Sequence, residues 1–368
     1  MLSDKLLAQG QHVMTVCNAC RYCEAYCPVF PAMENRLVFS KGDLTYLANL
    51  CHNCGECLYA CQYAPPHEFG INVPTTLAQI RGASYEEYCW PRFLSVAFTR
   101  QPLLTMVVVS LGFIAVILTT KPIPTTSAGG DFYRVMPHHV MVTLFAAVSV
   151  LVVTALVVGC RRFWRDIEAG RVSAFERRSV GVTALPGLRD ALTLRHLHGG
   201  GVDCTAAPET RTPWRRWCHH ATFYGFVLCF ASTSVAAFYH VVLGWRAPYA
   251  YTSLPVVLGT LGGLGLVVGP TGLLAVGRRR DEALGDPTHR GLDTPLVALL
   301  LLASLTGLLL LVLRDGTTMP SLLIVHLSVV LALLLTLPYG KFVHGLYRTS
   351  ALIKFARESD QEPKHEVG

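Results

Sequence analysis

Six long apolar stretches constrain the fold of this 368-residue chain more than any other feature. They cover residues 103–120, 138–160, 219–243, 253–276, 295–313 and 321–343. Each is close to the ~20 residues that an α-helix needs to cross a bilayer. A single span must be helical, because its backbone polar groups find no water in the hydrocarbon core. The sequence therefore predicts a bundle of about six transmembrane helices.

Basic residues are distributed unevenly between the segments that connect these stretches. The connections 161–218 and 277–294, together with the tail from Gly345, contain nineteen Lys and Arg residues, whereas the alternate connections contain four. Loops rich in Lys and Arg stay in the cytoplasm, so we expect both chain ends there. The first ten residues also lack the apolar core of a signal peptide. This pattern accounts for the net charge of +7 without a nucleic-acid partner.

Residues 1–102 form a separate polar region that contains two identical cysteine motifs, each with the spacing C-x2-C-x2-C-x3-C. The motif cysteines are Cys17, Cys20, Cys23 and Cys27, then Cys51, Cys54, Cys57 and Cys61. In a reducing compartment, cysteines at such spacings favour metal binding over disulfides. The spacing lets three thiolates wrap one corner of a [4Fe–4S] cubane, and it predicts two such clusters.

The fourth cysteine of each motif is expected to bind the other motif's cluster, as in two-cluster ferredoxins. Cluster one would then take Cys17, Cys20, Cys23 and Cys61, and cluster two Cys51, Cys54, Cys57 and Cys27. Structural zinc is the alternative, but eight regularly spaced thiolates suit two cubanes better than a four-ligand ion.

Four other residues of the head receive lesser roles. Gln62 follows Cys61 where many ferredoxins have proline, which alters that loop without removing a ligand. We expect His52 and His67 to be hydrogen-bond partners, and Cys89 to be a buried small residue.

Histidines near the ends of two spans predict haem binding. His219, His220 and His240 bracket the span 219–243, and His326 and His344 belong to the last span. Ionisable residues in spans are costly and usually functional. On a continuous helix His326 and His344, 18 residues apart, share a face and lie about 27 Å apart. The alternative is that these histidines cap helix ends or lie in the interfacial zone of the membrane.

Helical geometry favours His219 over His220 as the partner of His240, at about 60° on the helical wheel against about 160°. Because the two spans run in opposite directions, His219 would pair with His344 near the cytoplasm and His240 with His326 near the outside. One or two bis-histidine b-type haems could bind there. His138 and His139 are substitutes for an outer ligand.

The sequence resembles the tricarballylate/citrate utilisation protein B family over nearly the whole chain. The resemblance rests on the paired cysteine motifs, Tyr63-Ala-Pro-Pro-His-Glu-Phe69, His219-His-Ala-Thr-Phe-Tyr-Gly-Phe226 and Ala237-Phe-Tyr-His240. It implies a bacterial inner-membrane iron–sulfur protein with haem. It also implies a partner, an FAD-dependent tricarballylate dehydrogenase, whose reduced flavin is reoxidised at the expense of membrane quinone. Both His219 and His220 match, so the resemblance leaves the haem ligand open.

The residues agree with this role, since the chain lacks a dinucleotide-binding fingerprint and shows no means of oxidising an organic acid itself. Two alternatives are a membrane-anchored iron–sulfur redox sensor and a transporter with an accessory metal domain. The histidine pairs disfavour the sensor, and the lack of charged residues at mid-membrane disfavours the transporter.

The expected fold is mainly α, with a ferredoxin-like helical head and a transmembrane bundle. We divide it into the head at 1–102, two spans at 103–160, a cytoplasmic Arg-rich loop at 161–218, four spans at 219–346 and a tail at 347–368. We expect the loop either to dock on the cluster head or on a partner protein, or to be a plain connector.

Overall fold

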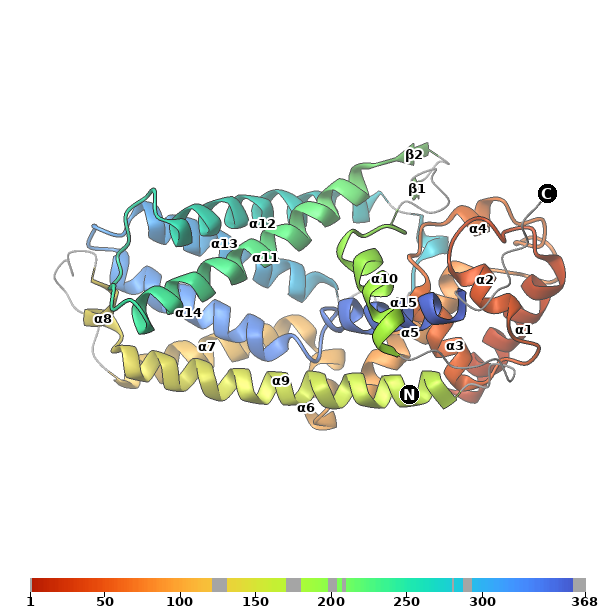
Figure 1. Cartoon of the computed structure of the whole chain (residues 1–368), viewed down its shortest axis with the longest axis horizontal. Helices are drawn as coiled ribbons and strands as arrows, with labels where there is room; N and C mark the ends of the chain where they lie inside the picture. Colours follow the sequence, from red (N-terminus) through yellow and green to blue (C-terminus); the bar gives the residue numbers. More distant parts are fainter. Residues whose placement is uncertain are drawn as a thin grey trace.

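The computed structural model has an elongated shape, with a helical head at one end and a bundle of long helices at the other (Figure 1). The structure describes residues 2–120, 131–169, 180–197, 204–206, 210–279, 281–286 and 293–359. In these ranges it is helical apart from one antiparallel ribbon of β1 (Cys204–Ala206) and β2 (Thr210–Thr212). The predicted helical class is confirmed.

Five helices build the head: α1 (Asp4–Cys20), α2 (Val29–Glu34), α3 (Lys41–Leu50), α4 (Glu56–Tyr59) and α5 (Val73–Tyr88). The three long ones begin at residues that cap free N–H groups. Ser3 accepts from Leu6 N, Asn72 accepts from Thr75 N, and Ser40 forms a reciprocal capping box with Asp43. These caps fix where each helix starts and therefore where each cysteine motif is presented.

Five helices are long and apolar enough to cross a membrane: α9 (His138–Ala169), α11 (Trp214–Val241), α12 (Leu254–Arg278), α13 (Asp293–Val312) and α14 (Met319–Thr336). A sixth candidate is the pair α6 (Arg92–Arg100) and α7 (Pro102–Thr120), which bends by 113° at its break. Among the described residues, five to six spans are compatible with a multi-pass membrane protein.

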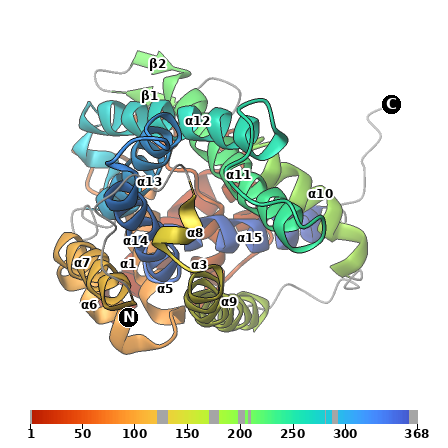
Figure 2. The same ribbon diagram turned by 90° about the vertical axis from the view of Figure 1, so that its left-hand side faces the viewer.

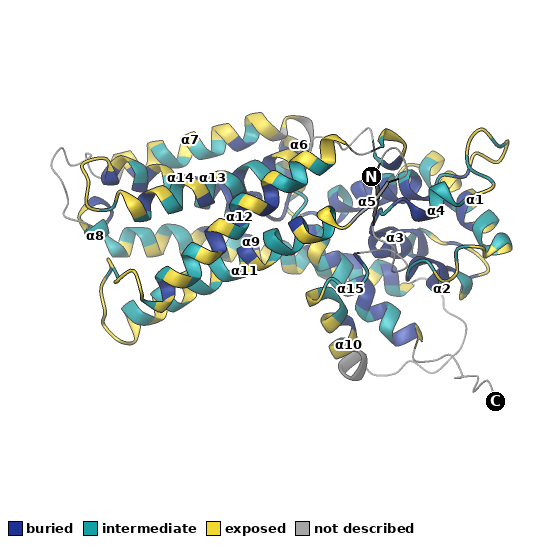
Figure 3. Cartoon of the chain, turned by 90° about the horizontal axis from the view of Figure 1, so that it is seen from above, coloured by how far each residue is buried: buried dark blue, intermediate teal, exposed yellow. Residues whose placement is uncertain are grey.

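Packing within the bundle is centred on α14, which contacts α7, α9 and α13, while α12 lies between α11 and α13 (Figure 2). The outer faces carry exposed apolar side chains, such as Val150 and Phe230, at 67% and 69% exposure (Figure 3). Apolar surface of this extent suits contact with lipid. The short helix α8 (Phe132–Val135) lies at the end farthest from the head, which we name the far end.

Glycines bring α11 and α12 into backbone contact. A Cβ added at Gly225 would lie 3.0 Å from Gly262 O, and one at Gly269 would lie 2.6 Å from Thr222 N. Small residues permit such close approach of two helices in a membrane. The Gly-rich span at 253–276 is therefore a packing surface.

The final helix α15 (Val343–Ser359) belongs to the head. Its Tyr347, Ala351 and Leu352 join the apolar core of the head, as do Phe163 and Ile167 from the end of α9. The domain division drawn from the sequence assigned 347–368 to a tail and ended the second span at residue 160. The structure instead folds residues 347–359 and 161–169 against the head.

The last span is shorter than the sequence suggested, so one inference drawn from it is wrong. Helix α14 ends at Thr336, Pro338 follows, and α15 starts only at Val343. Proline lacks the N–H that would continue the helix, and its ring clashes with the preceding turn. His326 and His344 therefore lie on different helices rather than on one face of a single helix.

The three connections predicted to be cytoplasmic contact the head end. Helix α10 (Val180–Leu192) packs on α15, and the 3-10 helix η1 (Glu282–Leu284) packs on α5. Asn72 Nδ2 donates to Ala283 O at 2.8 Å. Of the two alternatives for the 161–218 loop, its described part docks on the head. Residues 170–179, 198–203 and 207–209 of this loop lie outside the described residues.

Candidate metal centres

The first cysteine motif straddles the end of α1. The helix ends after Cys20, and Arg21 adopts a left-handed conformation with φ of 54°, which turns the chain sharply. A loop then carries Cys23 and leads to Cys27 just before α2. Helix α1 therefore presents two cysteines on its last turn, and the turn at Arg21 brings a third round to them.

The second motif follows α3 directly. Cys51 caps the end of α3, and Asn53 and Gly55 have positive φ values of 57° and 96°. Glycine adopts such a conformation without strain, whereas other residues adopt it with steric strain. A Cβ at Gly55 would also lie 3.0 Å from a methyl of Leu284. These turns wrap the loop that carries Cys51, Cys54 and Cys57.

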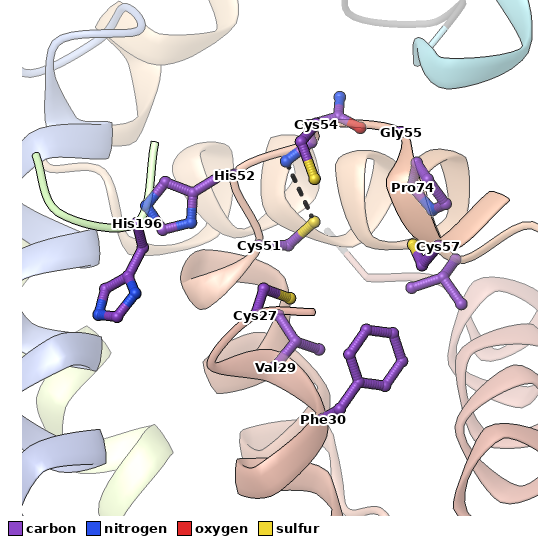
Figure 4. Close-up of a pocket in the computed structure, with 12 residues that line it drawn as sticks. Cys27, Val29, Phe30, Cys51, His52, Cys54, Gly55, Cys57, Pro74 and His196 are labelled. Carbon is purple, nitrogen blue, oxygen red and sulfur yellow. Dashed lines mark hydrogen bonds between the residues drawn. The ribbon is translucent and has the colours of Figure 1, made fainter. Parts of the chain in front are cut away.

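The eight motif cysteines divide between two pockets. The residues Cys17, Cys20, Cys23 and Cys61 line one of them, together with Cys57, and we name it the first pocket. The second pocket is lined by Cys27, Cys51, Cys54 and Cys57 (Figure 4). Each pocket thus gathers three cysteines from one motif and the fourth cysteine of the other. This is the crossed grouping that ferredoxin-type spacing leads one to expect.

The electrostatics of both pockets call for a cationic group. Burial, with repulsion from Cys61, raises the pKa of Cys17 and of Cys23 to about 12. Burial, with repulsion from Cys51, raises the pKa of Cys27 and Cys57 well above the ordinary value. Thiols this close ionise together only when a positive centre compensates their charge, and thiolate is the form that binds metal.

The arrangement suits a cluster better than a single ion. No three His, Cys, Asp or Glu side chains among the described residues converge on a point that could hold one metal ion. The ligands of a cubane surround a body of four irons, so their sulfurs need not converge. The grouping of the cysteines therefore suits iron–sulfur clusters, in keeping with the spacing of the two motifs.

The remaining head residues take up defined positions. Gln62 Nε2 lies 4.0 Å from Cys20 Sγ, so the residue that replaces a proline contacts a motif cysteine. His67 Nδ1 accepts from Phe69 N at 3.1 Å, which confirms it as a hydrogen-bond partner. His52 lines the second pocket with a buried Nδ1 that has no partner in the described chain. Cys89 is 3% exposed and is the buried small residue that was expected.

A second histidine, which the sequence did not single out, reaches the second pocket from the docked loop. His196 follows α10, lines this pocket, and lies 6.1 Å from His52 between ring centroids (Figure 4). Its Nε2 lies 3.4 Å from Asp190 Oδ2. The loop therefore closes one side of the pocket rather than passing by it.

Three arginines that the sequence did not single out converge on the loop of the second motif. Arg81 and Arg348 both donate to Cys51 O at 2.6 Å, and Arg215 donates to His52 O and Asn53 O at 3.0 and 2.9 Å. Burial, with repulsion from Arg81, lowers the pKa of Arg348 to about 10, so its guanidinium remains protonated at neutral pH.

The inner histidine pair of the sequence prediction comes together in the structure. The rings of His219 and His344 lie 6.1 Å apart between centroids and are nearly perpendicular. Metal–nitrogen bonds of about 2 Å on either side of an iron place two imidazole centroids about 6 Å apart. His344 Nδ1 lies 2.5 Å from Lys341 O, a contact that leaves Nε2 for a metal. His220 instead stacks on Tyr224.

The outer pair does not form as the sequence suggested. His240 stacks on His138 at 4.0 Å, and its Nδ1 lies 3.3 Å from the Tyr133 hydroxyl. His326 is occupied by Thr306, whose hydroxyl lies 3.0 Å from its Nδ1. Stacked rings at 4.0 Å leave no room for an iron between them. His240 and His326 therefore each engage a partner other than the one predicted, and of the two substitutes, His138 and His139, the first stacks on His240.

Comparison with known proteins identifies the family. The family model for citrate utilization protein B matches residues 94–364, and the model for the Fer4-like domain of that protein matches residues 10–87, a range that includes both cysteine motifs. Citrate utilization protein B of Escherichia coli is 46% identical over 356 residues, which covers 95% of this chain and 92% of the relative. No solved structure matches the chain significantly. The family matches and the 46% identity show that this chain belongs to the citrate utilization protein B family.

Proposed function

We propose that this protein carries electrons from a reduced FAD-dependent dehydrogenase, of the tricarballylate dehydrogenase type, to quinone in a bacterial inner membrane. The observation that carries the proposal is the division of eight cysteines into two pockets, each with three ligands from one motif and one from the other. Iron–sulfur clusters bound there would supply one-electron chemistry, which suits the splitting of a flavin's electron pair.

The residues of the chain provide binding and insulation for such a path. Cys27 and Cys61 tie the two pockets into one unit, because each belongs to one motif by sequence and to the other by position. Apolar side chains, including Phe30 and Val73, line both pockets and limit the access of water. We further propose that the head faces the cytoplasm, in keeping with the basic residues of the connections near it.

We also propose a single b-type haem, held between His219 and His344. The support is the ring separation of 6.1 Å and the buried Nδ1 of His219, which has no hydrogen-bond partner in the described chain. Because the far-end histidines engage one another or Thr306, we expect one haem per chain rather than two. A reduced-minus-oxidised spectrum with haem quantification on the purified protein tests this number.

The central test follows flavin reoxidation in membranes. The protein is placed in quinone-containing vesicles, mixed with reduced tricarballylate dehydrogenase, and flavin absorbance is recorded by stopped flow. We expect rapid reoxidation with the unmodified protein and with Cys89→Ser, whose cysteine is buried outside both pockets. Cys20→Ser and Cys54→Ser should each abolish it. Flavin that stays reduced although iron, sulfide and quinone are all present would rule out the proposal and favour a redox sensor.

A further inference from the structure

The two pockets differ in the charge that surrounds them. Around the second pocket, Arg81 comes from α5 of the head, Arg215 from the first turn of α11 and Arg348 from α15. All three donate to carbonyls of one short loop, at Cys51, His52 and Asn53. In the described part of the chain no arginine or lysine lines either pocket directly, and the first motif has one comparable contact, from the exposed Arg21, which donates to Asn18 O at 3.1 Å.

The positive charges of Arg81 and Arg348 are not neutralised by a described carboxylate. Arg81 is 8% exposed, and neither Arg81 nor Arg348 forms an ion pair with any described carboxylate. Their guanidinium groups are satisfied by backbone carbonyls, which are neutral acceptors. A buried cation with a neutral partner projects its field into its surroundings, where the low dielectric strengthens it.

From this asymmetry we propose that Arg81, Arg215 and Arg348 raise the reduction potential of the cluster in the second pocket above that of the first, so that the second is the acceptor. The inference rests on the proposed function, since it needs clusters in both pockets. An added electron makes a thiolate-ligated cluster more negative, and nearby positive charge stabilises that form. One electron leaves the first centre as the second gains it, and no bond or proton is exchanged.

The same arginines link the second pocket to the inner histidine pair. Arg215 precedes His219 by four residues on α11, and Arg348 follows His344 by four residues on α15. Residues four apart lie on one face of a helix, about 6 Å apart along its axis. Two helices therefore each carry an arginine to the second pocket and an imidazole to the inner pair. The order of electron transfer in this proposal is from the first pocket to the second pocket and then to the inner histidines.

Redox titration followed by EPR on the full-length, cluster-loaded protein tests the proposal. The signals of the two sites are assigned with Cys20→Ser and Cys54→Ser. In the unmodified protein the second-pocket signal should appear at the higher potential. R81Q and R348Q should each lower the equilibrium constant for its reduction about tenfold, or about 59 mV for a one-electron couple. The first-pocket signal should move much less.

Two control variants separate charge from structure. R348K keeps the positive charge, so the reduction potential of the second-pocket cluster should stay close to that of the unmodified protein. R162Q removes an arginine that also donates to a cysteine carbonyl, Cys89 O at 3.3 Å, but outside both pockets, and it should leave both potentials in place. Unchanged potentials in R81Q and R348Q, or a lower potential at the second pocket of the unmodified protein, would overturn the proposal. An unmodified protein without any cluster signal would instead overturn the proposed function.

Discussion

The head end and the far end of the bundle both hold paired histidines, yet their surroundings differ. At the head end, His219 and His344 meet nearly at right angles, and a ring nitrogen of His219 is left without a partner in the described chain. At the far end, His138 and His240 stack, and Tyr133 occupies a nitrogen of His240. Two close imidazoles are therefore equivalent only if their ring nitrogens are equally free, and this difference is the reason for proposing haem at the head end alone.

The largest expected effect separates the two ends directly. His344→Ala should remove the b-type band of the reduced-minus-oxidised spectrum, because the proposed haem would lose one of the two residues that would hold it. His240→Ala should keep the band, since its ring contacts other aromatic residues. Haem content per chain, measured on both variants in parallel, checks this. Equal loss of haem in both variants would mean that the far end also holds iron.

The next effect concerns the ionic contacts that fasten α15 to the head. Glu358 accepts from Arg36 at 2.7 Å and from Tyr46 at 3.0 Å, and all three side chains are buried. Glu358→Ala leaves Arg36 buried with one fewer partner, so it should cost about 3 kcal/mol of unfolding free energy. Denaturation in detergent, followed by fluorescence, measures the loss.

The matched change at the far end is Asp315→Ala. Asp315 is 75% exposed and lies 3.9 Å from Arg314. Solvent screens such a pair, so the change should cost below about 1 kcal/mol. A cost at Asp315 that equals the cost at Glu358 would contradict the view that only the head end is fixed by buried charge.

The packing of α11 against α12 should show a smaller difference between the two ends. An alanine at Gly269 would put its Cβ 2.6 Å from Thr222 N, which is backbone one turn from His219, so the helices must separate. Overpacking of this kind costs about 1–3 kcal/mol. Nearer the far end, a Cβ at Gly259 meets only the flexible side chain of Ser232.

Gly277→Ala is the control on the same helix, since nothing lies within 4 Å of its Cβ position. The midpoint temperature of thermal unfolding and the haem content should fall most for Gly269→Ala and less for Gly259→Ala. Neither should fall for Gly277→Ala. A different ranking would show that the separation of α11 and α12 does not depend on these glycines.

The smallest effect is expected at His326. Thr306→Val removes the hydroxyl that lies 3.0 Å from His326 Nδ1 and should cost about 1 kcal/mol. Haem and cluster signals should be unchanged, because this histidine lies outside the proposed path. A shift of the haem spectrum in Thr306→Val would show that His326 has a redox role after all.

Local patterns in the sequence were sufficient for much of the fold. The helical class follows from apolar run lengths, and the family from the motif residues. The grouping of Cys17 and Cys61 in one pocket follows the spacing rule of two-cluster ferredoxins. Each of these depends on contacts that a periodic pattern encodes.

Features that depend on distant partners could not be predicted in this way. The apolar run through 337–342 masks the end of α14, and only Pro338 hints at it. Nothing local shows that α15 packs on a head encoded 300 residues earlier. The arginines are a similar case: Arg215 and Arg348 stand four residues from His219 and His344, but their carbonyl acceptors are set by tertiary packing.

The packing of α15 into the head has a consequence for the order of synthesis. The ribosome makes the two cysteine motifs before the segment Val343–Ser359, yet Tyr347, Ala351 and Leu352 complete one apolar core with the head. N-terminal regions usually fold early during translation. Here the head remains unfinished until every span has emerged and the last helix has returned to it. We therefore expect the head to reach its final packing only after the helical bundle has been synthesised.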